Sequence, residues 1–454
     1  MPTFRFVFAL LFCAGFLSAQ EPDLPSGLGG SNDKKTSDAE EKTDGGPTLP
    51  PGLGEPAEDD KEPTPEPPAE EGRLMHVLTS TDLTGFAEAR AGVRAQPDPH
   101  HDDMSIGELR LQVDASRPVG PTYVNLKADF IYDYEHQEHD IDLEEGEGWL
   151  DLRSANILFT PVHFMDVKAG RQILTWGTGD LIFINDLFPK DWNSFFIGRD
   201  DEYLKAPSDA VKVSFFTDRL PNLDLIYTPR FDPDRYVDGS RLSFYNPLVG
   251  GKAGEDNVID VDMPDEWFND AEIAARLYKT VGGYELAGYY YRGFWKSPAG
   301  INPVTREFAF PDLSVYGASV RGTFLAGIGY LEGGYYRSRD DEDGNNPFVD
   351  NSEIRLLGGY EQELATNLTG TFQYYIEHML DHDQYLDALP PGFPARDETR
   401  HTLTIRLRKE LMQEDLILSI FTRYSITDND AYIRPKINYS LNDNWEIEIG
   451  RAHV

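Results

Sequence analysis

The stretch that decides the fold is RHTLTIRLRKEL, residues 400–411. In an extended strand, successive side chains point to opposite faces. One face of this stretch is apolar: Leu403, Ile405, Leu407 and Leu411. The other face is polar: Thr402, Thr404, Arg406, Arg408 and Glu410. A strand with leucine on one side and arginine on the other belongs to a sheet that separates an apolar environment from an aqueous one.

The same alternation with period two recurs from about Leu83 onward, and it predicts strands. It is clearest in ELRLQVDA, YVNLKADFIYDY, NLTGTFQYYIE and AYIRPKINYS. The pattern predicts about 17 strands of about ten residues each, the last beginning at Trp445, and no helical stretch between them.

The connectors between these strands alternate in length and charge. Long acidic connectors, such as HQEHDIDLEEGEG and SRDDEDGNNPFVDN, alternate with short ones, such as TPVH and TVGG. Only SITDND is short where a long connector is due. Short turns at one end and long loops at the other are typical of outer-membrane β-barrels, in which neighbouring strands satisfy the backbone hydrogen bonds that lipid cannot.

We therefore predict an all-β fold, an antiparallel transmembrane β-barrel of about 16–18 strands, with 18 in the complete chain. The alternative is a soluble β-sandwich with the apolar faces inside. The one-sided loops and an export signal argue against that alternative.

The N-terminus MPTFRFVFALLFCAGFLSAQ has the pattern of a secretory signal peptide. Arg5 gives the positive n-region, an apolar run follows, and small residues precede a cleavage site after Ala19. We predict that residues 1–19 are removed and that the protein is located in the bacterial outer membrane. Cleavage would remove Cys13, the single cysteine, and exclude disulfides and thiolate metal sites.

Residues 20–72 are rich in Pro, Gly, Glu and Asp, which predicts a disordered tail before a barrel at 73–454. One phrase occurs twice in the tail, as LPSGLGG and LPPGLGE. It is either linker sequence or a duplicated motif that docks a periplasmic protein.

The overall charge limits the partners. The 79 acidic and 41 basic residues give a net charge of −38, which argues against nucleic acid, and mean hydropathy is −0.48. Acidic loops suit a surface exposed to water, divalent cations and lipopolysaccharide, beside the outer-membrane lipid.

The polar strand faces predict a lumen lined by cations. The candidate pore-lining residues are Arg110, Lys127, Arg171, Arg406, Arg408, Arg423, Arg434 and Lys436. Cations along a narrow aqueous channel favour anions. The alternative is a wall of ion pairs that only keeps the lumen hydrated.

The connector at 177–206 is rich in Trp and Phe, unlike the acidic loops. We expect it to fold inward and narrow the channel as a constriction loop. The alternative is that it packs on the rim or on a neighbouring subunit. Its candidate residues are Trp176, Asp180, Asp186, Asp191 and Trp192.

GRQILTWGTGD followed by INDLFPKDW resembles the signature of a proteobacterial outer-membrane β-barrel family of unknown function, similar to alginate-export-like porins. The chain has NDLFPKD where that family has an Asn-Pro-x-Asp pattern. The resemblance implies a channel or transport component, with Arg171, Trp176 and Asp191 at the pore or its constriction.

The last predicted strand runs outward, so we expect a returning strand to be missing. The final letters, EIGRAHV, are what a common sequencing adapter encodes in one reading frame. We therefore expect residues 448–454 not to be native; the alternative is a natural variant that ends here.

These patterns favour a porin-like channel for a small solute, with anionic and amphipathic solutes as candidates. The alternative is the barrel component of a multi-protein export or envelope-assembly system that docks a periplasmic partner through the tail. No catalytic motif stands out, so we expect no enzyme activity, no cofactor and no metal, even at His100 and His101.

Overall fold

The computed structural model describes residues 4–10, 81–135 and 140–451. Most of the predicted signal peptide and the whole tail at 20–72 lie outside these residues, so both stay predictions. None of the described helices is long and apolar enough to cross a membrane.

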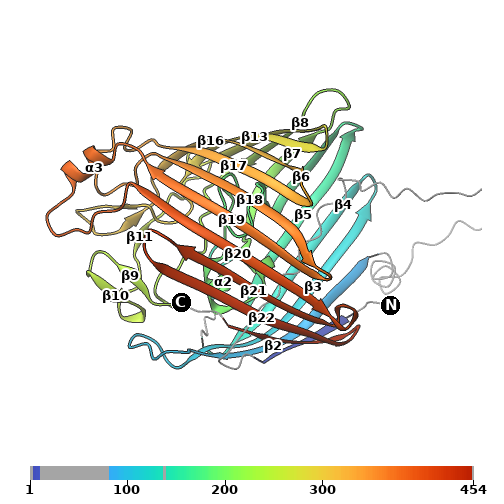
Figure 1. Ribbon diagram of the computed structural model, residues 1–454. Coiled ribbons are helices and arrows are strands. Elements are labelled where there is room, and N and C mark those ends of the chain that lie inside the picture. Colours follow the sequence, from blue (N-terminus) through green and yellow to red (C-terminus); the bar gives the residue numbers. More distant parts are fainter. Residues whose placement is uncertain (1–3, 11–80, 136–139, 452–454) are drawn as a thin grey trace, which may run out of the picture. The chain divides into compact units, whose positions relative to one another are not determined.

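The strands form one closed sheet of 18 strands (Figure 1). Seventeen of them follow one another around the ring, each antiparallel to its neighbours, which confirms the predicted barrel class. The eighteenth, β1, consists of residues 4–10 of the predicted signal peptide; it lies between β23 and β2 and runs parallel to both. Strands β2 and β23 therefore run in the same direction. Cleavage of that peptide would remove β1 from the ring.

The bounds of the barrel strands follow chain order after β1: β1 Phe4–Leu10, β2 Asp82–Val93, β3 Met104–Val119, β4 Thr122–Asp133, β5 Leu150–Val162, β6 Met165–Ile173, β7 Pro207–Phe215, β8 Asn222–Thr228, β12 Glu272–Val281, β13 Tyr284–Phe294, β16 Asp312–Phe324, β17 Gly327–Ser338, β18 Glu353–Ala365, β19 Leu368–Met379, β20 Thr399–Leu411, β21 Leu416–Ser425, β22 Asp430–Asn442 and β23 Trp445–Gly450.

The connectors alternate as predicted, with SITDND the short exception. The long ones gather at one end of the barrel, where α3 and the β9–β10 hairpin lie at the left of Figure 1. The connectors contain short elements that the sequence did not predict: α2 Trp192–Ile197, η1 Asp201–Leu204, β9 Phe244–Asn246, β10 Gly251–Ala253, η2 Glu255–Asn257, β11 Val261–Asp262, β14 Gly300–Ile301, β15 Phe308–Ala309, α3 His382–Ala388 and η3 Met412–Glu414.

The two faces of the wall have opposite chemistry. In β20, Leu403 and Ile405 are about 40 % exposed, whereas Thr402 and Thr404 are almost fully buried. In β3, Leu109 is 56 % exposed and its neighbour Arg110 only 2 %. Charged residues thus face the inside of the barrel and apolar residues its outside, the reverse of a soluble protein.

Candidate functional site in the barrel lumen

The connector between β6 and β7, residues 174–206, lies inside the barrel, where α2 is visible through the wall in Figure 1. Most of its side chains are buried or half-buried. We call it the inner segment. Its first part is apolar and its last part is charged, and the two parts contact different stretches of the wall.

The first part of the inner segment packs as a hydrophobic core against β8 to β19. Ile184 is completely buried, and its carbonyl oxygen accepts a hydrogen bond from the hydroxyl of Tyr336. Trp176 packs edge-on against Phe188, with ring centroids 4.9 Å apart. Other members of this core come from the wall: Ile226, Ala274, Tyr291, Leu313, Val315, Tyr330, Leu357 and Tyr375.

A single buried carboxylate fixes the backbone of this part. Glu332 of β17 accepts hydrogen bonds from the backbone N–H and hydroxyl of Thr178, at 2.6 and 2.8 Å. It also accepts from the backbone N–H and side-chain amide of Asn185, at 3.0 and 2.9 Å. Four hydrogen bonds to one carboxylate hold two turns of the inner segment at a defined place on the wall.

Asp180 connects the inner segment to β20. Its two carboxylate oxygens lie 2.6 and 2.8 Å from Nε and Nη2 of Arg406, a bidentate pair. Gln373 of β19 binds the backbone of Asp180. The side-chain oxygen of Gln373 accepts from the N–H of Asp180, and its side-chain nitrogen donates to the carbonyl oxygen of Asp180.

The charged part of the inner segment binds the opposite stretch of the wall. Asp201 lies 2.6 Å from Arg434 and 3.2 Å from Arg406. Asp200 lies 2.6 Å from Lys436. Burial by itself raises the pKa of Asp200, but the charges of Lys436 and Arg90 lower it by more. The pKa of Asp200 therefore lies below its ordinary value.

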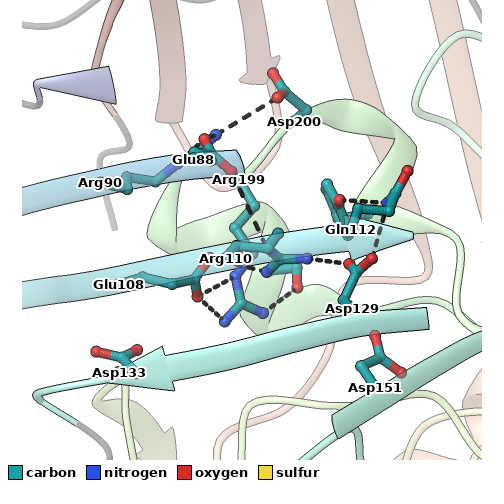
Figure 2. A network of polar contacts seen from close by, with 12 residues as sticks. Glu88, Arg90, Glu108, Arg110, Gln112, Asp129, Asp133, Asp151, Arg199 and Asp200 are labelled. Carbon is teal, nitrogen blue, oxygen red and sulfur yellow. Dashed lines mark hydrogen bonds and ion pairs between the residues drawn. The ribbon is translucent and has the colours of Figure 1, made fainter. Parts of the chain in front are cut away.

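A charge network continues into β2 and β3 (Figure 2). Arg199 of the inner segment lies 3.0 Å from Glu108, which also accepts from Arg110. Arg110 reaches on to Asp129 of β4 at 2.5 Å. The side chains of Glu108, Arg110 and Asp129 are at most 1 % exposed, and breaking such a network is costly, because a lone buried charge remains.

Tyr203 fills the space beside this network. The guanidinium of Arg110 lies 4.1 Å and that of Arg153 4.9 Å from its ring centroid. Its hydroxyl accepts from Gln112 at 3.0 Å. Burial is the main cause that raises the pKa of Tyr203, so the residue acts here as a neutral platform between two cations.

Asp191 begins α2 and holds the middle of the inner segment. Its carboxylate accepts from the N–H of Ser194 at 2.6 Å, a helix N-cap, and lies 3.2 Å from Arg235. Trp192 donates its indole N–H to Asp234 at 3.0 Å. Asp186 lies 3.0 Å from Lys190.

The predicted cations are placed as follows. Arg110, Arg406, Arg434 and Lys436 face the lumen, and each contacts carboxylates. Lys127 and Arg408 face it too, near Asp114 at 3.6 Å and Glu410 at 3.1 Å. Arg423 also faces the lumen but is exposed, with no ion-pair partner among the described residues.

The position of Arg171 differs from the prediction that it lines the pore. It pairs in register with Asp209, two positions along from Ala169 and Val211, and Val211 is 39 % exposed on the outer face. Arg171 therefore shares the outer face, where it lies 2.6 Å from Asp209 and donates to the carbonyl of Leu143. The continuous register of β6 with β7 thus places it on the side of Ala169 and Val211 and not on the lumenal side.

Sequence reasoning missed several residues that hold the inner segment: Glu88, Arg90, Glu108, Arg153, Arg199, Asp200, Asp201, Tyr203, Arg235 and Glu332. The alternation in ELRLQVDA puts Glu108 on the polar face, but it does not show the contact of Glu108 with Arg199. The acidic pair in GRDDEY could have indicated a contact with the lumenal arginines.

Among the described residues, no group of three or more His, Cys, Asp or Glu side chains is arranged to hold a metal ion.

Comparison with known proteins gave no matching family model and no matching curated relative. Among solved structures, the chain is similar to the outer membrane channel DcaP of Acinetobacter baumannii, at 10 % identity over 82 % of this chain and 95 % of that one, with a TM-score of 0.39. It is also similar to Pseudomonas putida OprB (13 %, 80 % and 91 %, 0.37) and to Salmonella typhi OmpF (8 %, 76 % and 89 %, 0.42).

Proposed function

We propose that this chain is an outer-membrane channel that passes a small hydrophilic solute through a lumen narrowed by the inner segment. The observation that carries the proposal is the inverted burial of the wall. Leu331 is 62 % exposed on the outside and Arg153 1 % on the inside. Only a closed barrel with lipid outside and water or polar groups inside makes both placements favourable.

The inner segment supports the view of a narrow channel. It binds β17, β19 and β20 through Glu332, Gln373 and Arg406, and β22 through Arg434 and Lys436. A solute must pass beside this segment or displace it. In this proposal Trp176, Asp180, Asp186, Asp191 and Trp192 belong to the constriction.

The ion pairs reduce the expected anion selectivity. Each cation next to the inner segment contacts a carboxylate, so its field is largely cancelled at the distance of a passing ion. Among the predicted lumenal cations, we expect Arg423 to attract anionic solutes most strongly, because no carboxylate among the described residues pairs with it. A polar solute with an anionic or amphipathic character remains our candidate, with weak selectivity.

The experiment is the reversal potential of the full chain in a planar lipid bilayer under a salt gradient. We expect discrete conductance steps with a small anion preference. Larger steps are expected when residues 178–186 are replaced by a short Gly-Ser linker, because this removes the contacts with Glu332 and Arg406. A chain that stays soluble without detergent and never conducts would refute the channel.

A further inference from the structure

The outer face of the barrel has a groove of about 310 Å³ across β19 to β22, separate from the lumenal site. It is open to the outside and its lining is almost entirely apolar. The residues that line it are Leu368, Leu407, Lys409, Leu418, Ser419, Ile420, Lys436 and Ile437.

The strand register explains why a groove forms here. Leu407 and Ile420 are cross-strand neighbours on the outer face, and their outer partners in this row are Gly370 and Pro435. Pro435 carries only a short ring, so the row is low at this end, whereas the side chains of Leu364 and Phe372 fill the space above Gly370. The adjacent row towards the strand end is Leu368, Lys409, Leu418 and Ile437.

The next row contains the one charged group of the groove that faces outward. Lys409 lies between Leu368 and Leu418 in register. Its ammonium donates to the carbonyl oxygen of Thr366 at 2.6 Å, and no carboxylate pairs with it among the described residues. An ammonium beside lipid-facing leucines is unfavourable unless an anion or water compensates the charge.

The position of the groove along the barrel axis indicates which anion can reach Lys409. Lys409 is two residues before the end of β20 at Leu411, at the end of the barrel with short turns. In the proposed membrane orientation, that end faces the periplasm. The boundary between hydrocarbon and lipid headgroups of the inner leaflet therefore lies near the Lys409 ammonium.

We propose that this groove is a binding site for one glycerophospholipid of the periplasmic leaflet. An acyl chain lies between Leu407, Leu418 and Ile437, and the headgroup phosphate accepts hydrogen bonds from Lys409. The apolar lining, the unpaired cation and its place at the strand end all fit this one ligand. The inference rests on the proposed location in the outer membrane.

The test is native mass spectrometry of the delipidated full chain in detergent, with added palmitoyl-oleoyl-phosphatidylglycerol or palmitoyl-oleoyl-glycerol. We expect one phosphatidylglycerol to be retained at collision energies that strip the others. The diacylglycerol, which has the same chains without phosphate, should be retained at least tenfold less.

Two variants and one control make the test specific. Lys409→Gln should reduce retention about tenfold by removing the cation, and Ile420→Trp should abolish it by filling the groove. The control is Lys279→Gln, because Lys279 also lies near a strand end with short turns, is half-buried like Lys409 and donates to a backbone carbonyl, that of Arg219. Its retention should equal that of the unmodified chain.

Equal retention in Lys409→Gln and Lys279→Gln, or a second copy of the chain bound in place of lipid, would overturn the site. A chain that conducts in bilayers but shows such equal retention refutes the groove and leaves the channel standing. A chain that does not insert at all refutes the channel instead. Heat-modified migration on gels shows that each variant is folded before it is compared.

Discussion

The substitution Asp201→Asn is the sharpest test of how the inner segment is held. Asp201 bridges Arg434 and Arg406, at 2.6 and 3.2 Å. After the change, Arg406 keeps its bidentate partner Asp180. Arg434 keeps the carbonyl of Arg199, at 2.7 Å, and the ring of Phe195, 4.5 Å away, but no carboxylate. The side chain of Arg434 is 3 % exposed, so its charge would be left buried and without an ion-pair partner.

Removing one partner of a buried ion pair costs about 3–5 kcal/mol. Taking the lower bound, the equilibrium constant for local release of residues 198–205 should rise on the order of 100-fold, at about 1.4 kcal/mol per factor of ten. The substitution keeps the size of the side chain, so the rest of the barrel should remain folded.

The assay is amide hydrogen exchange of the chain in detergent, read by mass spectrometry of peptides from residues 198–205. Local opening controls the exchange of these amides. The control is Asp428→Asn, since Asp428 also pairs with an arginine, Arg400 at 2.9 Å, but at an exposed turn. Exposed pairs contribute up to about 1 kcal/mol, so the control should leave residues 198–205 unchanged. Unchanged exchange in Asp201→Asn as well, in a folded barrel, would refute the ionic attachment.

Three further predictions follow from single contacts. Arg423→Gln should shift the reversal potential towards cations, because this lumenal cation is exposed and has no described ion-pair partner; an unchanged potential would contradict its role. Tyr336→Phe should raise exchange of residues 180–186 by the equivalent of about 1 kcal/mol, the usual value of one hydrogen bond, here to Ile184. Burial first, and then the charge of Arg94, lower the pKa of His101 below its ordinary value near 6.5. The folded loop at 94–103 therefore favours the neutral imidazole. Its stability is full above about pH 6.5 and falls as the pH drops below that value. Exchange of that loop, corrected for intrinsic rates, should therefore rise from pH 7.5 to pH 5.5, and His101→Gln should remove the pH dependence.

The barrel was predictable because alternation is a local property of the chain. The sequence of each strand shows by itself which side chains share a face. The predicted start of the last strand, Trp445, is the first residue of β23. The partners of the inner segment were not predictable in the same way. Asp180 and Arg406 are 226 positions apart, and no local pattern tells which lumenal arginine meets which acidic residue.

Two of the failed predictions have different causes. Arg171 was assigned to the pore from a family resemblance, although Val167 and Ala169 put it in the apolar, outward phase of MDVKAGRQI. The helix α2 was missed although its signals are local, an N-cap at Asp191 and a left-handed Gly198 at its end. Six residues are too few to show a helical period.

The contacts of the inner segment also set an order of assembly. Its apolar part needs β17 to be in place and its charged part needs β3 and β22, which come from opposite ends of the chain. The contacts with β3 and those with β22 are not expected to be complete together while the sheet is still an open ribbon, because these strands lie near opposite ends of the chain. The inner segment must therefore dock late, after the wall has curled round. Contacts so distant in sequence form slowly, so docking of the inner segment is expected to be among the last steps of folding.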